Sequence, residues 1–88
     1  MKIKEGFILK EIAGSYVVVP VGEDLVDFTL MITINETGAF LWNCLASDKT
    51  QQELVELLKG EYEGATDEQL ASDVAEFVTL LKENNVLE

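Results

Sequence analysis

The stretch Asn35-Glu36-Thr37-Gly38-Ala39-Phe40-Leu41-Trp42-Asn43-Cys44-Leu45 predicts the helix around which the rest of the chain is arranged. Asn35 suits the N-cap position, because its side-chain oxygen can accept a hydrogen bond from a backbone N–H one turn into the helix. One face carries four residues at helical spacing: Gly38, Leu41, Trp42 and Leu45. Phe40 and Cys44 lie on a different face, so this short helix is apolar nearly all round and should be covered on several sides.

Three residues of this helix have specific expected roles. Trp42 is expected to be a core anchor, because its large ring lies on the apolar face of a covered helix. Gly38 weakens the helix, which suggests that it lets another backbone approach closely. Cys44 is the only cysteine, so an internal disulfide is ruled out, and a buried thiol is the expected state.

Length and charge limit what the chain can be. The 88 residues are enough for one domain with a modest core, so residues 1–88 are predicted to form a single unit. The chain has 17 acidic residues, six lysines and no arginine, which gives a net charge of −11. Nucleic-acid binding is not expected, because phosphates are held by cations and guanine is read mostly by Arg. The charge would repel an anionic membrane and attract basic partners, although acidity that only maintains solubility is an equal alternative.

The chain also lacks targeting and catalytic signals. No apolar run follows the charged residues 1–5, and no stretch approaches the ~20 apolar residues of a transmembrane helix, so a cytoplasmic location is expected. There is no His, and no CxxC, HExxH, GxGxxG, P-loop or GxSxG motif occurs. We therefore expect no enzymatic activity and no cofactor. The carboxylates are interpreted as solvated charge on helix faces, with a carboxylate-only metal site as the less favoured alternative.

The first third of the chain is predicted to form an antiparallel sheet. Residues 7–12 and 15–21 are rich in strand-forming residues and are separated by the turn signal Ala13-Gly14. A second turn at residues 22–24 precedes a third strand at 27–34. The core face of this third strand is expected to carry Leu30, Ile32 and Ile34. Short turns imply a meander in which the first and third strands are the edges.

Two further helices are predicted after the central one. Thr50 and Glu53 form a capping box at the start of the first of them. Its apolar residues are Leu54, Leu57, Leu58 and Tyr62, with Val55 beside them. Thr66 and Gln69 form a second capping box. The last helix is expected to bury Leu70, Val74, Phe77, Val78 and Leu81. Asn84-Asn85 suits a left-handed C-cap, after which the tail can fold back.

Leu80 does not belong to the buried stripe of the last helix. At about 100° per residue it lies roughly a quarter-turn from the centre of the stripe. Gln69, Asp73 and Glu76 share its side of the helix, with Phe77 at the border. Scattered surface exposure is one interpretation of Leu80, and the wall of a groove is the other.

The order of three strands and then three helices resembles a winged helix-turn-helix. Over nearly its whole length the sequence resembles the PqqD family, named for the pyrroloquinoline quinone biosynthesis protein D. The most specific feature is the Asn-x-Thr-Gly-x-x-x-Trp core from Asn35 to Trp42. The other matching segments are Thr50-Gln51-Gln52-Glu53-Leu54, Asp73-Val74, Phe77, Leu80-Leu81 and Val86-Leu87-Glu88. Asn85 replaces the usual Gly but tolerates the same backbone conformation. The resemblance implies an α+β fold with a three-stranded antiparallel sheet followed by three helices.

The resemblance implies a binding protein rather than an enzyme. Members of the family recognise the leader segments of ribosomally synthesised, post-translationally modified peptides. They add the leader as an extra strand between the third strand and the last helix, and they present the attached core peptide to a modifying enzyme, often a radical S-adenosylmethionine protein. Asp73 and Glu76 could hold a basic residue of such a leader. Carried onto this chain, the implied peptide-binding residues are Phe28, Thr29, Leu30, Met31, Ile32, Thr33, Asp73, Glu76, Phe77 and Leu80.

Two other classes of function are weighed against this one. A DNA-binding winged helix is opposed by the net charge of −11 and by the lack of arginine. The main alternative is a small winged-helix subunit, regulatory or structural, that binds a protein without capturing a peptide. An uncovered third-strand edge also predicts a weak homodimer, and the sequence leaves open which residues of that strand point their amides outward.

Overall fold

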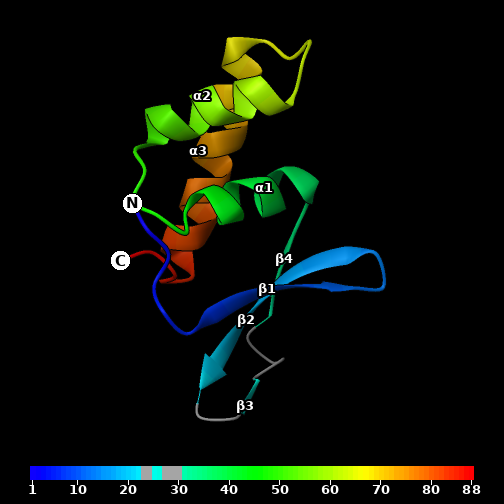
Figure 1. Ribbon diagram of the computed structural model, residues 1–88, viewed down its shortest axis with the longest axis vertical. Helices are drawn as coiled ribbons and strands as arrows, with labels where there is room; N and C mark the ends of the chain where they lie inside the picture. Colours follow the sequence, from blue (N-terminus) through cyan, green and yellow to red (C-terminus); the bar gives the residue numbers. More distant parts are fainter. Residues whose placement is uncertain (23–24, 27–30) are drawn as a thin grey trace.

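The computed structural model describes residues 1–22, 25–26 and 31–88, and it has the predicted order of an antiparallel sheet followed by three helices (Figure 1). The strands are β1 (Phe7–Ile12), β2 (Ser15–Gly22), β3 (Leu25–Val26) and β4 (Ile32–Ile34). The helices are α1 (Glu36–Cys44), α2 (Gln51–Glu61) and α3 (Asp67–Glu83). The predicted α+β fold class is confirmed. Within the described residues, no helix combines the length and the apolar character needed to cross a membrane.

The sheet is built around β2. On one side, β1 pairs with it in antiparallel register, and the two-residue turn between them has positive φ at Ala13 (51°) and Gly14 (82°). Positive φ at both turn residues is the geometry of a type I′ turn, which suits the twist of a hairpin. On the other side, β3 pairs with residues 21–22 of β2, and β4 pairs with residues 16–18. β1 and β4 therefore lie on opposite sides of the central strand.

The third strand differs in extent from the sequence prediction. Instead of one strand over residues 27–34, the described residues form β3 and β4, both on the same side of β2. Pairing starts earlier than predicted because Gly22, expected in a turn, is itself paired with Leu25. Met31 lies outside both strands, and residues 27–30 lie outside the described part of the chain. Within β4 the predicted alternation holds, since Ile34 is buried and Thr33 is exposed.

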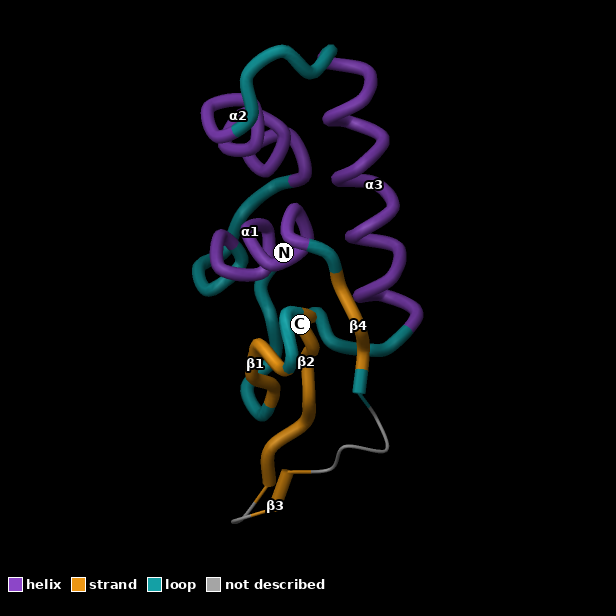
Figure 2. The backbone as a smooth tube through the Cα atoms, turned by 90° about the vertical axis from the view of Figure 1, so that its right-hand side faces the viewer, coloured by secondary structure: helices purple, strands orange, loops and turns teal. Residues whose placement is uncertain are grey.

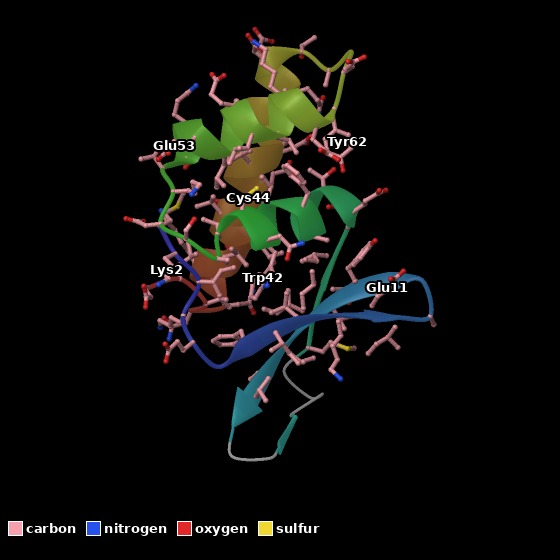
Figure 3. All side chains as sticks on the ribbon, viewed as in Figure 1. Lys2, Glu11, Trp42, Cys44, Glu53 and Tyr62 are labelled. Carbon is pink, nitrogen blue, oxygen red and sulfur yellow. The ribbon has the colours of Figure 1, made fainter. Side chains whose placement is uncertain are left out.

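Helix α1 is the covered central helix that the sequence predicts. Asn35 caps it, because its Oδ1 accepts a hydrogen bond from the Gly38 amide at 2.7 Å. The four predicted face residues are all buried: Gly38, Leu41, Trp42 and Leu45. Trp42 points from α1 toward β1 and the N-terminal segment (Figure 3) and is only 7% exposed, which confirms its role as a core residue. On another face, Phe40 meets the ring of Tyr62 edge-on, with ring centroids 6.3 Å apart.

Two expectations for α1 are corrected. A Cβ on Gly38 would meet side-chain atoms rather than another backbone: the Ile34 Cβ at 3.1 Å and the Phe77 Cε1 at 3.3 Å. Gly38 therefore lets α1 pack closely against a strand residue and the α3 ring. Cys44 points from α1 toward α2 (Figure 3) and is half-buried rather than buried. Its partial burial still raises the pKa of the thiol, and Lys49 only partly opposes this.

Helix α2 has the predicted start but a narrower apolar face. The capping box is complete: Glu53 N–H donates to Thr50 Oγ1 at 3.1 Å, and Thr50 N–H donates to Glu53 Oε1 at 3.0 Å. Leu54 and Leu58 are fully buried, but Leu57 is 41% exposed. Leu57 lies on the side of the helix away from Val55 and Tyr62, which the core covers. Its predicted place on the buried face is therefore wrong.

Helix α3 buries all five residues of its predicted stripe: Leu70, Val74, Phe77, Val78 and Leu81. Thr66 is its N-cap and accepts the amide of Gln69 at 3.1 Å. The Gln69 side chain does not complete the predicted second capping box, because its Nε2 donates to Asp73 Oδ1 at 3.0 Å instead. A carboxylate one turn along the helix is a strong acceptor for it. This bond orients Asp73 on the surface of the helix.

The two ends of the described chain lie side by side (Figure 1). Asn85 has a φ of 57°, which confirms the predicted left-handed residue after α3. The tail then folds back as predicted: Val86 is fully buried, and Leu87 forms an antiparallel bridge with Ile3. Together, the buried Val86 and the bridge between Leu87 and Ile3 fix the C-terminal end of α3 to the rest of the core.

Candidate functional site

A groove with a volume of about 660 Å³ lies between β4, the start of α1 and the C-terminal two-thirds of α3. Figure 2 shows β4 descending from α1 beside the lower half of α3, and residues of these three elements line the open groove. The last strand and the central helix contribute Thr33, Ile34, Asn35, Thr37, Gly38 and Leu41 to its lining. The chain thus forms one concavity where the sheet edge meets the last helix.

All four site residues predicted on α3 line this groove. Phe77 is buried, and its ring lies 3.3 Å from the position of a Cβ on Gly38, so it closes the groove on the core side. Asp73 and Leu80 are half-buried, and Glu76 is exposed. The incomplete burial of Leu80 follows from its place a quarter-turn off the stripe. Of its two interpretations, the groove wall agrees with the geometry.

The predicted sheet residues are placed less uniformly. Thr33 is exposed and lines the groove. Ile32 is half-buried against the core, and Met31 is 46% exposed; neither of them is part of the lining. Phe28, Thr29 and Leu30 lie outside the described residues.

The sequence analysis missed part of the lining. On α3 the missed residues are Ser72, Ala75, Thr79 and Glu83. Glu83 follows Glu76 by seven residues, or about two helical turns, so helical periodicity alone could have placed it on the same side. Asn35 and Gly38 were assigned only structural roles, yet the N-cap turn of α1 also opens onto the groove. A capping motif predicts where a helix begins, but it does not predict which surface of the protein the helix end faces.

The edge of β4 borders this groove. On an antiparallel strand, successive residues point their backbone N–H and C=O groups alternately toward and away from the paired neighbour. β4 pairs with β2, and no described residue pairs with its other side. The described part of β4 therefore presents backbone donors and acceptors next to the acidic and apolar side chains of α3.

Comparison with known protein families shows to which family the chain belongs. The sequence model of the family described as "Coenzyme PQQ synthesis protein D (PqqD)" matches residues 16–87. The chain belongs to the PqqD family. The matched region begins in β2 and includes β4, all three helices and the tail, so it spans every described element of the groove. A comparison with curated protein sequences gives no match.

Two solved structures share the fold of this PqqD-family chain. One is described as "TbiB1 in Complex with the TbiA(beta) Leader Peptide": it has a TM-score of 0.72 and 20% sequence identity, and the match covers 100% of this chain and 95% of that one. The other is "Lasso peptide synthetase B1 complexed with the leader peptide": it has a TM-score of 0.68 and 20% identity, with 97% and 93% covered. At this identity the likeness establishes the fold.

Proposed function

We propose that this protein is a non-catalytic peptide chaperone that binds the leader segment of a precursor peptide by strand addition to β4. The observation that carries the proposal is the groove between an edge strand and α3, in which backbone groups and side-chain contacts are available together. In this mode of recognition, main-chain hydrogen bonds give affinity and neighbouring pockets select side chains. Both solved neighbours of the same fold are complexes with leader peptides, which supports the assignment.

The peptide-binding residues in this proposal come from both walls of the groove. Thr33 and Ile32 belong to β4, which would pair with the leader, and Met31 and residues 28–30 precede them in the sequence. All four predicted α3 residues line the groove: Phe77 and Leu80 would supply apolar contact, and the carboxylates of Asp73 and Glu76 would meet a basic side chain. The bound leader would position the attached core peptide for a modifying enzyme. From the family we propose a radical S-adenosylmethionine enzyme as that partner.

Leu80 gives the sharpest test, because it lines the groove without belonging to the buried stripe. Replacing Leu80 with Lys removes an apolar contact and places a charge where the peptide would exclude water. We expect binding to weaken by about 1–3 kcal/mol, roughly 5- to 150-fold in Kd. Asp73→Asn should weaken binding less, and its effect should fade as the salt concentration rises if Asp73 meets a basic residue.

The matched control is Leu57→Lys, the same substitution at an exposed leucine on α2 outside the groove lining. Peptides captured from the native cells by the immobilised protein would be identified by mass spectrometry, synthesised and titrated by calorimetry. Circular dichroism would verify that each variant is folded. Unchanged binding by folded Leu80→Lys protein would place the peptide elsewhere and refute the site.

A small regulatory or structural winged-helix subunit is the alternative function. It would bind a folded partner protein, and its interaction would not depend on an added strand at β4. Capture of a protein but no peptide, with equal retention by the Leu80→Lys and Leu57→Lys variants, would favour this alternative.

A further inference from the structure

The charges around the groove all have one sign. Asp73, Glu76 and Glu83 line it. None of the six lysines, all of which lie in the described residues, is part of the lining, and the chain has no arginine. Three of the lysines are engaged elsewhere: Lys4 Nζ donates to Asn85 Oδ1 at 2.8 Å, Lys49 Nζ donates to Ser47 Oγ at 2.6 Å, and Lys59 pairs with Asp67 at 3.1 Å. The described lining therefore favours a ligand that carries positive charge.

The two helix ends beside the groove alter its electrostatic potential but do not make that potential positive. The N-terminus of α1 opens onto the groove, and a helix N-terminus on its own favours an anion. However, Asn35 already occupies the Gly38 amide there, and Glu36 adds a negative charge in the first turn. At the opposite end, Lys82 in the last turn of α3 offsets the negative potential of the helix C-terminus, so the negative charge at this end of the groove comes from Glu83, which lines it.

The acidic and apolar side chains alternate along α3. At a rise of about 1.5 Å per residue, the midpoint of Asp73 and Glu76 lies about 6 Å along the axis from the midpoint of Phe77 and Leu80. Glu83 lies about 7 Å farther on by the same rise. On an extended strand, side chains that point to the same face are about 6.6–6.8 Å apart. The helix therefore offers acidic, apolar and acidic contacts at the spacing of alternate residues in a bound strand.

From this spacing along α3 we infer that the groove selects a peptide segment with the pattern basic–x–apolar–x–basic. Here x is any residue and basic is Lys or Arg. The inference rests on the proposed peptide-binding function and names the class of peptide that fits it. The apolar side chain would lie against Leu80 and Phe77. One basic side chain would meet the carboxylates of Asp73 and Glu76, and the other would meet Glu83.

The test is selection of a random 12-residue peptide library, displayed on phage, against the immobilised full-length protein. Enriched peptides should carry two basic residues four positions apart with an apolar residue midway. Synthetic copies of these peptides would then be titrated against charge-reversed variants. Glu83→Lys should weaken their binding by about three- to tenfold, and repeated selection on that variant should replace one basic residue with an acidic one.

Glu63→Lys is the matched control, because it makes the same charge change at an exposed residue outside the groove lining. It should change the Kd of the enriched peptides by less than about twofold, and 1 M salt should reduce the effect of Glu83→Lys. At the end of the groove opposite Glu83, charge should be reversed at the exposed Glu76. Asp73 is less suitable, because it accepts a hydrogen bond from Gln69 that the substitution would also remove.

The outcomes separate this inference from the proposed function. If no peptide is enriched, the peptide-binding function fails and the inference fails with it. If the enriched peptides bind Leu80→Lys protein at full strength, the peptide lies outside this groove, and the proposed site and the inference both fail. If the peptides lose binding to Leu80→Lys protein but carry no basic pair, or ignore Glu83→Lys, the pattern alone is overturned. The inference is supported if the selected peptides carry the basic–x–apolar–x–basic pattern and if selection on Glu83→Lys protein replaces one of their basic residues with an acidic one.

Discussion

Trp42→Ala tests the central helix directly. Trp42 is 7% exposed and packs in the main core, between α1 and the β1 side of the sheet. A buried aromatic side chain removes about 150–250 Å² from water, which at about 25 cal/mol per Å² corresponds to roughly 4–6 kcal/mol. The alanine methyl group keeps a small part of this, so the expected loss is about 3–5 kcal/mol.

The surroundings of Trp42 place the expected loss toward the lower end of that range. The ring borders a shallow second pocket of about 290 Å³ together with Ile3 and Phe7, so the N-terminal segment and water can partly fill the emptied site. A domain of this length has a total free energy of unfolding of about 4–13 kcal/mol. The variant should therefore be folded but marginal in buffer at 25 °C.

The assay is urea unfolding followed by circular dichroism at 222 nm, because Trp42 is the only tryptophan and its fluorescence is lost in the variant. Leu57→Ala is the control, since Leu57 is 41% exposed and should cost less than about 0.5 kcal/mol. The m-value should stay the same, which shows that only stability has changed. A loss below about 1 kcal/mol for Trp42→Ala would mean that the ring is not a core residue, and the account of α1 as the covered helix would be wrong.

Three further predictions concern the groove, the helix start and the sheet edge. Gly38→Ala should destabilise the fold by up to about 2 kcal/mol, because a gain of about 1 kcal/mol in helix propensity is offset by overpacking against Ile34 and Phe77; urea unfolding measures the net effect. The hydrogen bond from Thr50 lowers the pKa of Glu53, so its carboxylate stabilises the folded state above its ordinary pKa of about 4.5 and loses this effect as the pH falls through the lowered value. Glu53→Gln protein should therefore be less stable than the wild type at pH 7, and this difference should disappear as the pH falls through the lowered pKa of Glu53. Finally, the β4 edge should pair with a second copy at millimolar concentration to give a weak dimer, which analytical ultracentrifugation would detect and which a bound leader should dissociate; a monomer at that concentration would contradict this.

The parts of the fold that the sequence predicts well are those fixed by local chemistry. The caps at Asn35, Thr50 and Thr66 are formed as expected, because each depends on a side chain and an amide only three residues away. The buried stripe of α3 is also complete, since a long helix with one dense apolar face can pack in only one orientation. Local patterns of this kind need no knowledge of the partner surface.

The errors arise where a partner decides the outcome. Leu57 is as apolar as Leu58, and only the position of the neighbouring helices shows that it is exposed. Pairing with β2 begins already at Leu25, earlier than the turn signal at residues 22–24 indicated, because Gly22 of β2 is itself paired. In the groove, Leu80 was found because it departs from a stripe, whereas Thr37 and Thr79 were missed because a small polar residue on a helix gives no comparable signal.

Phe77 and Gly38 join the core to the groove and so divide the site into two kinds of residue. Phe77 is 7% exposed and belongs to the main core, yet its ring also closes the groove, where it lies against the position of the missing Gly38 Cβ. A change at either residue alters stability and groove shape together, so neither can adjust specificity alone. Leu80, Glu76 and Glu83 line the same groove at more accessible positions. Substitutions there can change which peptide fits with little effect on folding, and for this reason the binding tests are placed on these residues.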